Sequence, residues 1–276
     1  MRKLSEIMSG VAEKITVSNS DDDFLQSLQR QADRLNKEEG NLRGLDCPKC
    51  LNRGYINEVR GREIVWVTCS CSGARKSLAK IERSGLGNAI KTQTFDTYTA
   101  TENWQIAIKR LAETYAQSGE GRWFFIGGQS GAGKTHLCTA ISGKLLHSGK
   151  AVKYMLWCDE STKLKSVVND AEERDALMDE LKKAEVLYID DFLKTQKGVN
   201  PSSADVKLAF EILNYRYANK MMTIISSERV SGDIINIDEA LGGRIVEMSR
   251  PYNFCIDLSN DRAKNYRIKP NNTIYR

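Results

Sequence analysis

The sequence has no long hydrophobic run. Its longest apolar stretches, such as Trp123–Ile126 and Val186–Ile189, are short, whereas a helix that crosses a bilayer needs about 20 apolar residues. The first ten residues begin with basic side chains but have no apolar segment behind them, which is not the pattern of a secretory signal. We therefore expect a soluble, cytoplasmic protein with no membrane partner.

The sequence also has no strong excess of one charge. Its formal net charge is +5 over 276 residues, which permits contact with nucleic acid but does not require it, because dedicated DNA-binding proteins are usually more basic. With 41% hydrophobic residues the chain has enough apolar side chains for a packed core. A chain of this length forms one large domain, or one large and one small domain.

Strand-like and helix-like segments alternate from about residue 95 onward. Short apolar runs are followed by longer segments with apolar residues at helical spacing. Such alternation predicts an α/β fold, with a parallel sheet flanked by helices. The expected helices cover about 102–117, 134–147, 160–183, 203–219 and 241–248, and the expected strands cover 122–127, 152–157, 186–190, 222–226 and 254–258.

A glycine-rich loop joins one expected strand to the next helix. Glycines let backbone N–H groups turn inward around phosphate oxygens, and the start of the helix adds its positive end. Lys134 supplies a charge for the β- and γ-phosphates, and Thr135 supplies a hydroxyl for Mg²⁺. The loop therefore predicts a P-loop ATPase that binds ATP or ADP through Gly128, Gln129, Ser130, Gly131, Ala132, Gly133, Lys134 and Thr135.

An apolar strand that ends in two acids is the expected partner of this loop. Asp190 and Asp191 follow Val186–Ile189, and parallel sheets bind ligands at the carboxyl ends of their strands. We expect Asp190 to hold Mg²⁺ and Asp191 to orient or deprotonate the attacking water; a solvated acidic turn is the alternative. Ser226–Glu228 end the next strand and are candidates for contact with the γ-phosphate or the water.

Four of the seven cysteines lie close together in the sequence. Cys47 and Cys50 form a CxxC motif, Cys69 and Cys71 form a CxC motif, and two short β-like runs lie between them. A hairpin with a cysteine pair at each end brings four thiolates together, which suits Zn²⁺. Because all four ligands are cysteines, the ion would be structural. A disulfide or an Fe–S centre is the alternative.

The N-terminal part differs in composition from the rest of the chain. Residues 1–40 are polar, with thin apolar stripes at helical spacing; they predict helices that pack on a partner, or else a partly disordered arm. Residues 83–94 carry two glycines and few large side chains, which is typical of a linker. We therefore expect an N-terminal region at 1–82 with a zinc module at 45–75, a linker at 83–94 and an ATPase domain at 95–276.

These motifs, in this order, resemble the DnaC/DnaI-type helicase loaders, particularly those of phages, and the related ATPases DnaA and IstB. The most specific segments, beside the cysteine module and the glycine loop, are Leu187–Asp191, Thr223–Glu228 and Ile237–Ile245. The resemblance covers most of the chain, from the cysteine module to the C-terminus. It implies an AAA+ P-loop domain without a full helical lid, preceded by a small helical and zinc-binding domain.

The resemblance also implies roles for single residues. Arg244 would be the arginine finger, which reaches ATP on a neighbouring subunit and stabilises charge during hydrolysis; by itself it reads as a surface arginine. Ser227 would be the sensor residue, but many AAA+ proteins have asparagine there, so the role falls to Ser227 or Glu228. A second sensor arginine would be Arg250 or Arg267.

Partners follow from the same resemblance. The N-terminal region would bind the replicative hexameric helicase, while the AAA+ domain would bind ATP and single-stranded DNA and self-associate head-to-tail in a spiral or ring. Phe95 and Tyr98 would line the adenine pocket, or else pack in the core. Candidate contacts with the DNA backbone, with a solvated surface as the alternative, are Lys163, Lys165, Lys194 and Lys197.

The function expected from these features is that of an ATP-dependent helicase loader with weak, assembly-dependent ATP hydrolysis. One alternative is a transposition ATPase like IstB, which would assemble on double-stranded DNA. The other is a non-catalytic adaptor or inhibitor of the host's helicase-loading machinery. The cysteine module favours the loader.

Overall fold

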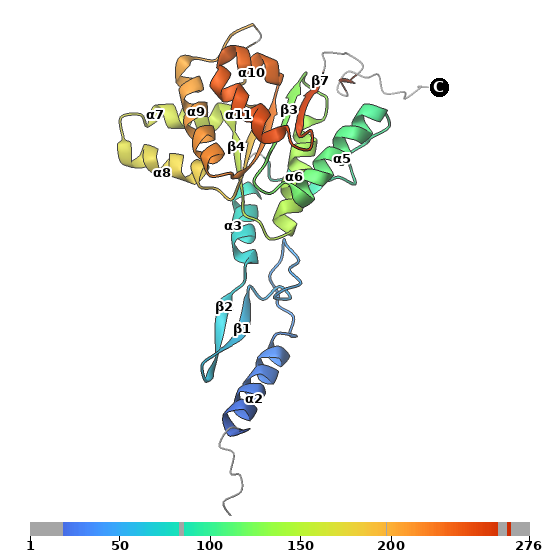
Figure 1. The fold of residues 1–276 in the computed structure, drawn as a ribbon, viewed down its shortest axis with the longest axis vertical. Coiled ribbons are helices and arrows are strands. Elements are labelled where there is room, and N and C mark those ends of the chain that lie inside the picture. The colour runs from blue at the N-terminus through green and yellow to red at the C-terminus, as the bar shows by residue number, and fades with distance from the viewer. Residues whose placement is uncertain (1–18, 83–85, 197, 259–263, 266–276) are drawn as a thin grey trace, which may run out of the picture. The chain divides into compact units, whose positions relative to one another are not determined.

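The computed structural model describes residues 19–82, 86–196, 198–258 and 264–265 (Figure 1). The chain divides into two compact units, Met1–Ser72 and Gly73–Arg276, and the boundary falls within helix α3 (Cys71–Glu82). Among the described residues, no helix has both the length and the apolar character that a membrane span requires. Apart from α3, each unit has its own helices and strands.

The first unit contains helix α2 (Asn19–Leu35) and a hairpin of strands β1 (Tyr55–Arg60) and β2 (Glu63–Thr68). The two strands are antiparallel, with Tyr55 opposite Thr68, so the hairpin expected between the two cysteine pairs is confirmed. Asn36, just after α2, donates a hydrogen bond to the carbonyl of Asn57 and accepts one from its N–H, both at 2.9 Å. These bonds tie the end of α2 to β1. The earlier helical stripe expected before α2 lies outside the described residues.

The second unit is built on a five-stranded sheet in which every strand pair is parallel. The strand order is β4-β5-β6-β3-β7. All five expected strands are present, each within a residue of its expected limits, which confirms the α/β fold. They are β3 (Trp123–Gly128), β4 (Val152–Leu156), β5 (Val186–Asp190), β6 (Met222–Ser227) and β7 (Cys255–Leu258).

Helices cover both faces of this sheet (Figure 1). On one side lie α4 (Ala89–Thr92), α5 (Asn103–Ser118) and α6 (Lys134–His147); on the other lie α7 (Trp157–Ser166), α8 (Ala171–Lys182), α9 (Ser203–Ala218), α10 (Ser231–Ile237) and α11 (Glu239–Ser249). The prediction of a single helix over 160–183 is wrong in one respect, because two helices, α7 and α8, cover this segment. Asp170 causes the division: its side chain accepts a hydrogen bond from the N–H of Glu173 and so caps α8.

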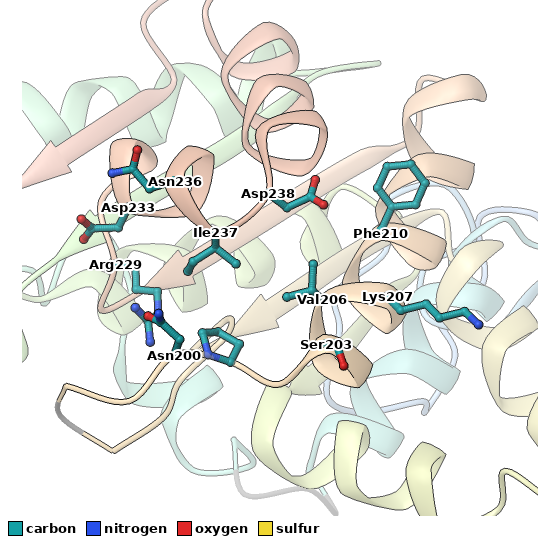
Figure 2. A pocket seen from close by; sticks show the side chains of 11 residues that line it. Asn200, Ser203, Val206, Lys207, Phe210, Arg229, Asp233, Asn236, Ile237 and Asp238 are labelled. Carbon is teal, nitrogen blue, oxygen red and sulfur yellow. The ribbon is translucent and has the colours of Figure 1, made fainter.

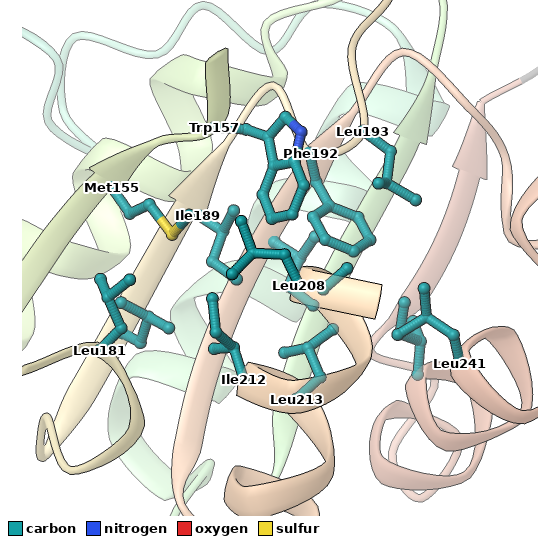
Figure 3. Close-up of a cluster of buried hydrophobic side chains, with 14 of the residues drawn as sticks. Met155, Trp157, Leu181, Ile189, Phe192, Leu193, Leu208, Ile212, Leu213 and Leu241 are labelled. Atoms are coloured by element: carbon teal, nitrogen blue, oxygen red, sulfur yellow. The ribbon is translucent and has the colours of Figure 1, made fainter. Parts of the chain in front are cut away.

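Because helices cover both faces of the sheet, all side chains of β3 and β5 are buried, and these central strands are continuous apolar runs. Figure 3 shows the cluster on the α9 side, where Trp157 meets Phe192 edge-on with ring centres 5.0 Å apart. Alternate strand residues, including Phe125, Leu187, Ile189 and Ile225, point into this cluster, together with Ile212 and Leu213 of α9 and Leu241 and Ile245 of α11.

The segment expected to be a linker is partly structured. Residues 83–85 lie outside the described residues, but α4 follows at Ala89–Thr92, and Leu86 and Ile90 are buried. The two compact units divide at Ser72 rather than within residues 83–94. The domain limits at 82 and 95 stay a prediction.

Candidate functional site

The glycine-rich loop connects β3 to α6. Gly128 has a φ of 125° and Gly133 a φ of 83°, values that L side chains rarely adopt. A Cβ on Gly128 would lie 2.2 Å from the carbonyl oxygen of Leu258, and a Cβ on Gly133 would lie 3.0 Å from Cε2 of Tyr98. The loop therefore needs glycine at both positions, and Gln129, Ser130, Gly131 and Ala132 form the turn between them.

Lys134 is the first residue of α6 and lies against the loop. It is only 6% exposed, and its Nζ donates hydrogen bonds to the carbonyls of Gly128 (2.8 Å) and Gln129 (2.7 Å). Burial lowers the pKa of Lys134, and the carboxylate of Glu228 is the main influence that opposes this shift. The ammonium group thus sits at the positive end of α6, where phosphate groups bind.

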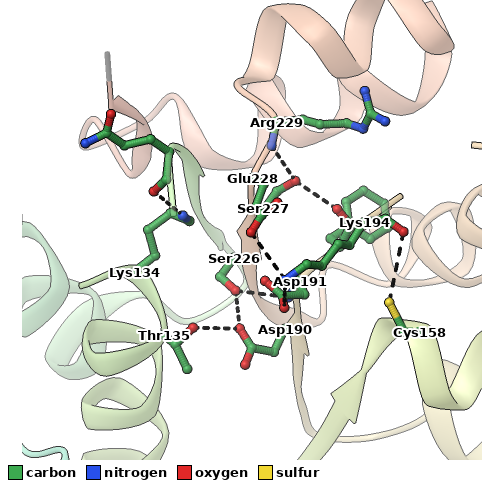
Figure 4. Close-up of polar contacts among 12 residues, drawn as sticks. Lys134, Thr135, Cys158, Asp190, Asp191, Lys194, Ser226, Ser227, Glu228 and Arg229 are labelled. Atoms are coloured by element: carbon green, nitrogen blue, oxygen red, sulfur yellow. Dashed lines mark hydrogen bonds and ion pairs between the residues drawn. The ribbon is translucent and has the colours of Figure 1, made fainter. Parts of the chain in front are cut away.

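The carboxylate of Asp190 accepts hydrogen bonds from three hydroxyl groups, two of which, those of Thr135 and Ser226, are drawn in Figure 4. Asp190 ends β5 and is 5% exposed. Its Oδ1 accepts hydrogen bonds from Thr135 Oγ1 (3.2 Å) and Ser226 Oγ, and its Oδ2 accepts one from Tyr154 Oη (3.3 Å). The two residues expected to hold Mg²⁺, Asp190 and Thr135, are therefore in contact, and their hard oxygen atoms fit that ion. Burial and the neighbouring Asp190 raise the pKa of Tyr154. Tyr154 was not among the site residues predicted from the sequence.

Lys194 lies between two carboxylates in the same pocket (Figure 4). Its Nζ is 2.7 Å from Asp191 Oδ2 and 3.2 Å from Glu228 Oε1, and the hydrogen bond to Asp191 raises the pKa of Lys194. These three side chains, with those of Lys134 and Thr135, line a pocket of about 370 Å³. The expected catalytic carboxylate Asp191 therefore faces the phosphate loop, and it does so as half of an ion pair.

Ser227 is turned away from this pocket. It is fully buried, its hydroxyl donates to the carbonyl of Phe192 (2.8 Å), and the same hydroxyl accepts a hydrogen bond from the N–H of Arg229 (3.1 Å). Glu228, the other candidate sensor, lines the pocket. Ser227 thus holds the turn that follows Asp191, and Glu228 presents its charge to the phosphate loop.

Segments from before α5 form another wall of the pocket. Tyr98 is 5% exposed and lines the pocket, and its ring meets that of His136 edge-on, with centres 5.2 Å apart. The ring of His136 also contacts the carbonyl of Thr94 through Nε2 at 2.9 Å. Phe95, the other candidate for the adenine pocket, is half-buried and does not line the cavity. The remaining lining residues here are Gln93, Thr97 and Thr99.

Arg244 lies on α11, apart from the residues that line the phosphate pocket. Its Nη1 donates to the carbonyl of Ala240 (2.8 Å), and its guanidinium lies over the rings of Phe210 (4.7 Å) and Tyr217 (5.3 Å). Phe210 also lines a second pocket of about 790 Å³ between α9 and α10 (Figure 2). The structure therefore places Arg244 beside this second pocket.

The other arginine and lysine candidates are dispersed. Arg250 is exposed at the end of α11, and Arg267 lies outside the described residues. Lys163 and Lys165 are exposed on α7, where Lys165 pairs with Asp205 at 2.8 Å. Lys197 also lies outside the described residues. Among the candidates that the structure describes, only Lys194 lines the phosphate pocket.

The four cysteines of the first unit form a compact cluster. Their sulfur atoms all lie within 4.8 Å of one another, with 3.8 Å between Cys47 and Cys69 and 3.7 Å between Cys50 and Cys71. Zn–S bonds of about 2.3 Å in a tetrahedron place sulfur atoms about 3.8 Å apart, so the cluster fits Zn²⁺. Burial acts to raise the pKa of Cys50, but the N–H of Gly54 and the neighbouring thiols lower it to about 7, which favours the thiolate that metals bind.

Comparisons with known proteins identify the family to which the second unit is similar. The family model described as the bacterial DnaA ATPase domain matches residues 90–248. The phage-like element PBSX protein XkdC of Bacillus subtilis (strain 168) is 35% identical over 220 residues, which cover 75% of this chain and 80% of that protein. The replicative helicase loader DnaC of Buchnera aphidicola is 24% identical over 186 residues, covering 64% of this chain and 71% of that protein.

Among solved structures, the crystal structure of the DnaC helicase loader superposes with a TM-score of 0.50 at 24% identity, over 56% of this chain and 92% of that chain. At this identity the likeness shows a shared fold. The family match spans more than half of the chain and includes the glycine loop, Asp190 and Arg244. The chain therefore belongs to the family of the bacterial DnaA ATPase domain, as an AAA+ ATPase of the replication-related group that resembles the DnaC-type helicase loaders.

Proposed function

We propose that this chain is an ATP-dependent loader, which binds the replicative hexameric helicase and helps place it on single-stranded DNA during the initiation of replication. The observation that carries the proposal is the presence of two units in one chain: a phosphate pocket on a DnaA-like fold, and a separate four-cysteine unit. An ATPase that assembles on DNA alone has no evident use for the four-cysteine unit. The similarity to a protein named as a replicative helicase loader supports the same choice.

In this function ATP lies with its phosphates on the loop Gly128–Thr135, and Lys134 contacts the β- and γ-phosphates. Thr135 and Asp190 would hold Mg²⁺, which offsets phosphate charge when bound. Asp191 orients the attacking water and accepts its proton. Ser227 acts as a positioning residue, because its hydroxyl holds the carbonyl of Phe192 directly after Asp191.

Arg244 serves as an arginine finger for a neighbouring copy of the chain. Its guanidinium lies over Phe210 and Tyr217 and outside its own phosphate pocket, so it cannot stabilise charge there. It can complete the site of a neighbour only if copies associate head-to-tail, and such contacts produce rings or open spirals. ATP hydrolysis is then weak in the isolated chain and increases on assembly.

The first unit provides the contact with the helicase, with Zn²⁺ as its structural ion on Cys47, Cys50, Cys69 and Cys71. Trp66 of β2 is 77% exposed and stacks on Tyr55 with ring centres 5.2 Å apart. Tryptophan is enriched among the residues that dominate binding energy at protein interfaces. A tryptophan held in this way on a small rigid hairpin supports the assignment of the partner surface to this unit.

Size-exclusion chromatography with the helicase, with and without a non-hydrolysable ATP analogue, tests the proposal. The chain should co-elute with the helicase when the analogue is present, and Lys134→Ala should abolish the complex because the phosphates lose their main cation. Lys144→Ala is the matched control, since this lysine is exposed on the same helix α6. Trp66→Ala should weaken the complex and leave nucleotide binding unchanged.

Two other outcomes would replace the proposal. If double-stranded DNA alone drives ATP-dependent assembly and no helicase binds, the chain is a transposition-type ATPase. If the helicase complex and loading are unchanged by Lys134→Ala, the chain is an adaptor that does not use its nucleotide site.

A further inference from the structure

The ammonium group of Lys194 is shared by two carboxylates that face the phosphate loop. It contacts Asp191 Oδ2 at 2.7 Å and Glu228 Oε1 at 3.2 Å, and all three side chains point toward the same place in Figure 4. A lysine ammonium has three N–H donors. Two carboxylates occupy two of them, so a third acceptor from a ligand can be added without breaking either contact.

The backbone fixes the position of Lys194. Asp191 and Leu193 both have a φ of 53°. Residues other than glycine seldom adopt this left-handed backbone conformation unless their surroundings impose it. The turn closes with a hydrogen bond from the N–H of Lys194 to the carbonyl of Asp191 (3.0 Å), and the N–H of Phe192 donates to the carbonyl of Ser226 (2.8 Å). The residues after β5 are thus held against the end of β6, which brings Lys194 back toward the pocket.

The charges in the pocket explain why a cation is needed there. The carboxylates of Asp190, Asp191 and Glu228 lie near the phosphate loop, and Lys134 and Lys194 are the lysines that line the pocket. A terminal phosphate beside Lys134 would otherwise face the carboxylates of Asp191 and Glu228 directly. Like charges a few ångströms apart repel strongly where water is partly excluded, and the repulsion is greatest for the phosphate that ATP has and ADP lacks.

We propose that Lys194 is a specificity-determining residue that favours ATP over ADP by contacting the terminal phosphate while it neutralises Asp191 and Glu228. The inference rests on the proposed ATP site and deepens it. Lys194 thereby becomes the second cation of the phosphate site, beside Lys134 at the start of α6. An ordinary surface ion pair would make no difference between the two nucleotides.

The test is the affinity of the full-length protein for a non-hydrolysable ATP analogue and for ADP, each with Mg²⁺, measured by calorimetry. Lys194→Met should raise the Kd for the ATP analogue by at least about tenfold, the size expected for losing one charge-assisted hydrogen bond, and should change the Kd for ADP much less. Lys194→Arg should retain most of the preference. Lys183→Met is the matched control, because Lys183 pairs with Asp179 at 2.6 Å on the exposed surface of α8.

A double variant distinguishes loss of ATP affinity caused by the change in charge from loss caused by misfolding. Glu228→Gln removes one of the carboxylates that Lys194 neutralises, so Lys194→Met with Glu228→Gln should recover part of the ATP affinity lost in Lys194→Met. A variant that merely misfolds would recover nothing and would lose ADP binding as well. If the wild type binds neither nucleotide, the proposed function itself fails. If the wild type binds both and Lys194→Met leaves the ratio of the two Kd values unchanged, the role of Lys194 is overturned and the ATP site stands.

Discussion

Arg216 of α9 is a fully buried cation, and its removal should destabilise the second unit strongly. The guanidinium donates to Thr223 Oγ1 (3.0 Å), to the carbonyls of Leu181 (3.1 Å) and Ala184 (2.8 Å), and also to those of Lys182 (3.1 Å) and Met222. No ion pair with a carboxylate is found for it among the described side chains. The charge is therefore compensated by the Thr223 hydroxyl and by backbone dipoles from the end of α8, the residues just before β5 and the start of β6.

The magnitude follows from these contacts. Burial lowers the pKa of Arg216 to about 10, so the side chain is still protonated at pH 7. Arg216→Ala leaves several buried carbonyls without a donor, each at about 1 kcal/mol or more, and opens a cavity. Relief of the buried charge offsets part of this loss. We expect the free energy of unfolding to fall by about 3–5 kcal/mol, and by less in Arg216→Met, which fills most of the space.

Urea unfolding followed by tryptophan fluorescence measures this change, because Trp123 and Trp157 are buried in the second unit and the midpoint and slope give the free energy. Arg110→Ala, on the exposed surface of α5, is the control and should change the value by no more than about 0.5 kcal/mol. A loss of less than about 1 kcal/mol in Arg216→Ala would refute the reasoning, since it would mean that the carbonyls find other donors at little cost.

Three further predictions concern the cysteine cluster, an ion pair and the phosphate loop. Cys71→Ser should reduce bound zinc, measured by atomic emission, and destabilise the first unit while nucleotide affinity is unchanged. Glu211→Gln should lower the free energy of unfolding by about 1 kcal/mol at pH 7, because Glu211 pairs with Arg174 (2.7 Å) and Lys182 (2.8 Å). Burial acts against the shift, but Lys182 and Arg174 lower the pKa of Glu211 below its ordinary 4.5, so this difference should vanish when urea titrations are repeated at a pH below the lowered value. Gly133→Ala, at a φ of 83°, should weaken binding of a fluorescent ATP analogue by about tenfold; unchanged affinity would show that the loop tolerates a side chain there.

The fold was predictable where the signal is local. Val186–Ile189 reads as a buried strand because helices cover both faces of a parallel sheet, and residues on both sides of the strand must then be apolar. The boundary between α7 and α8 was missed because apolar spacing continues through it, and the break depends on one side chain, that of Asp170. One capping residue gives a weaker sequence signal than apolar spacing that extends over many residues. The limits of helices are therefore harder to predict than the presence of a strand.

The candidate site divides in the same way. The loop residues and Asp190 could be identified because their positions follow from the order strand, loop, helix and from the carboxyl edge of the sheet. Lys194 and Tyr154 could not, since their contacts depend on two left-handed residues in a turn and on the reach of a side chain from the neighbouring strand β4. Ser227 ends β6, but its hydroxyl donates to the carbonyl of Phe192 rather than facing the phosphate pocket, a choice of rotamer that residue spacing does not reveal.

The turn after β5 and the end of β6 also connect the phosphate pocket with the pocket between α9 and α10. Glu228 lines the phosphate pocket, and the next residue, Arg229, lines the larger one. Arg229 donates from Nε to the carbonyl of Leu193 (3.2 Å) and from Nη2 to the carbonyl of Val199 (2.8 Å), so it holds both ends of the segment that begins with Lys194. The larger pocket is also lined by Phe210, on which Arg244 lies. Arg229 therefore ties the turn that carries Lys194 to the wall of the pocket beside which Arg244 lies.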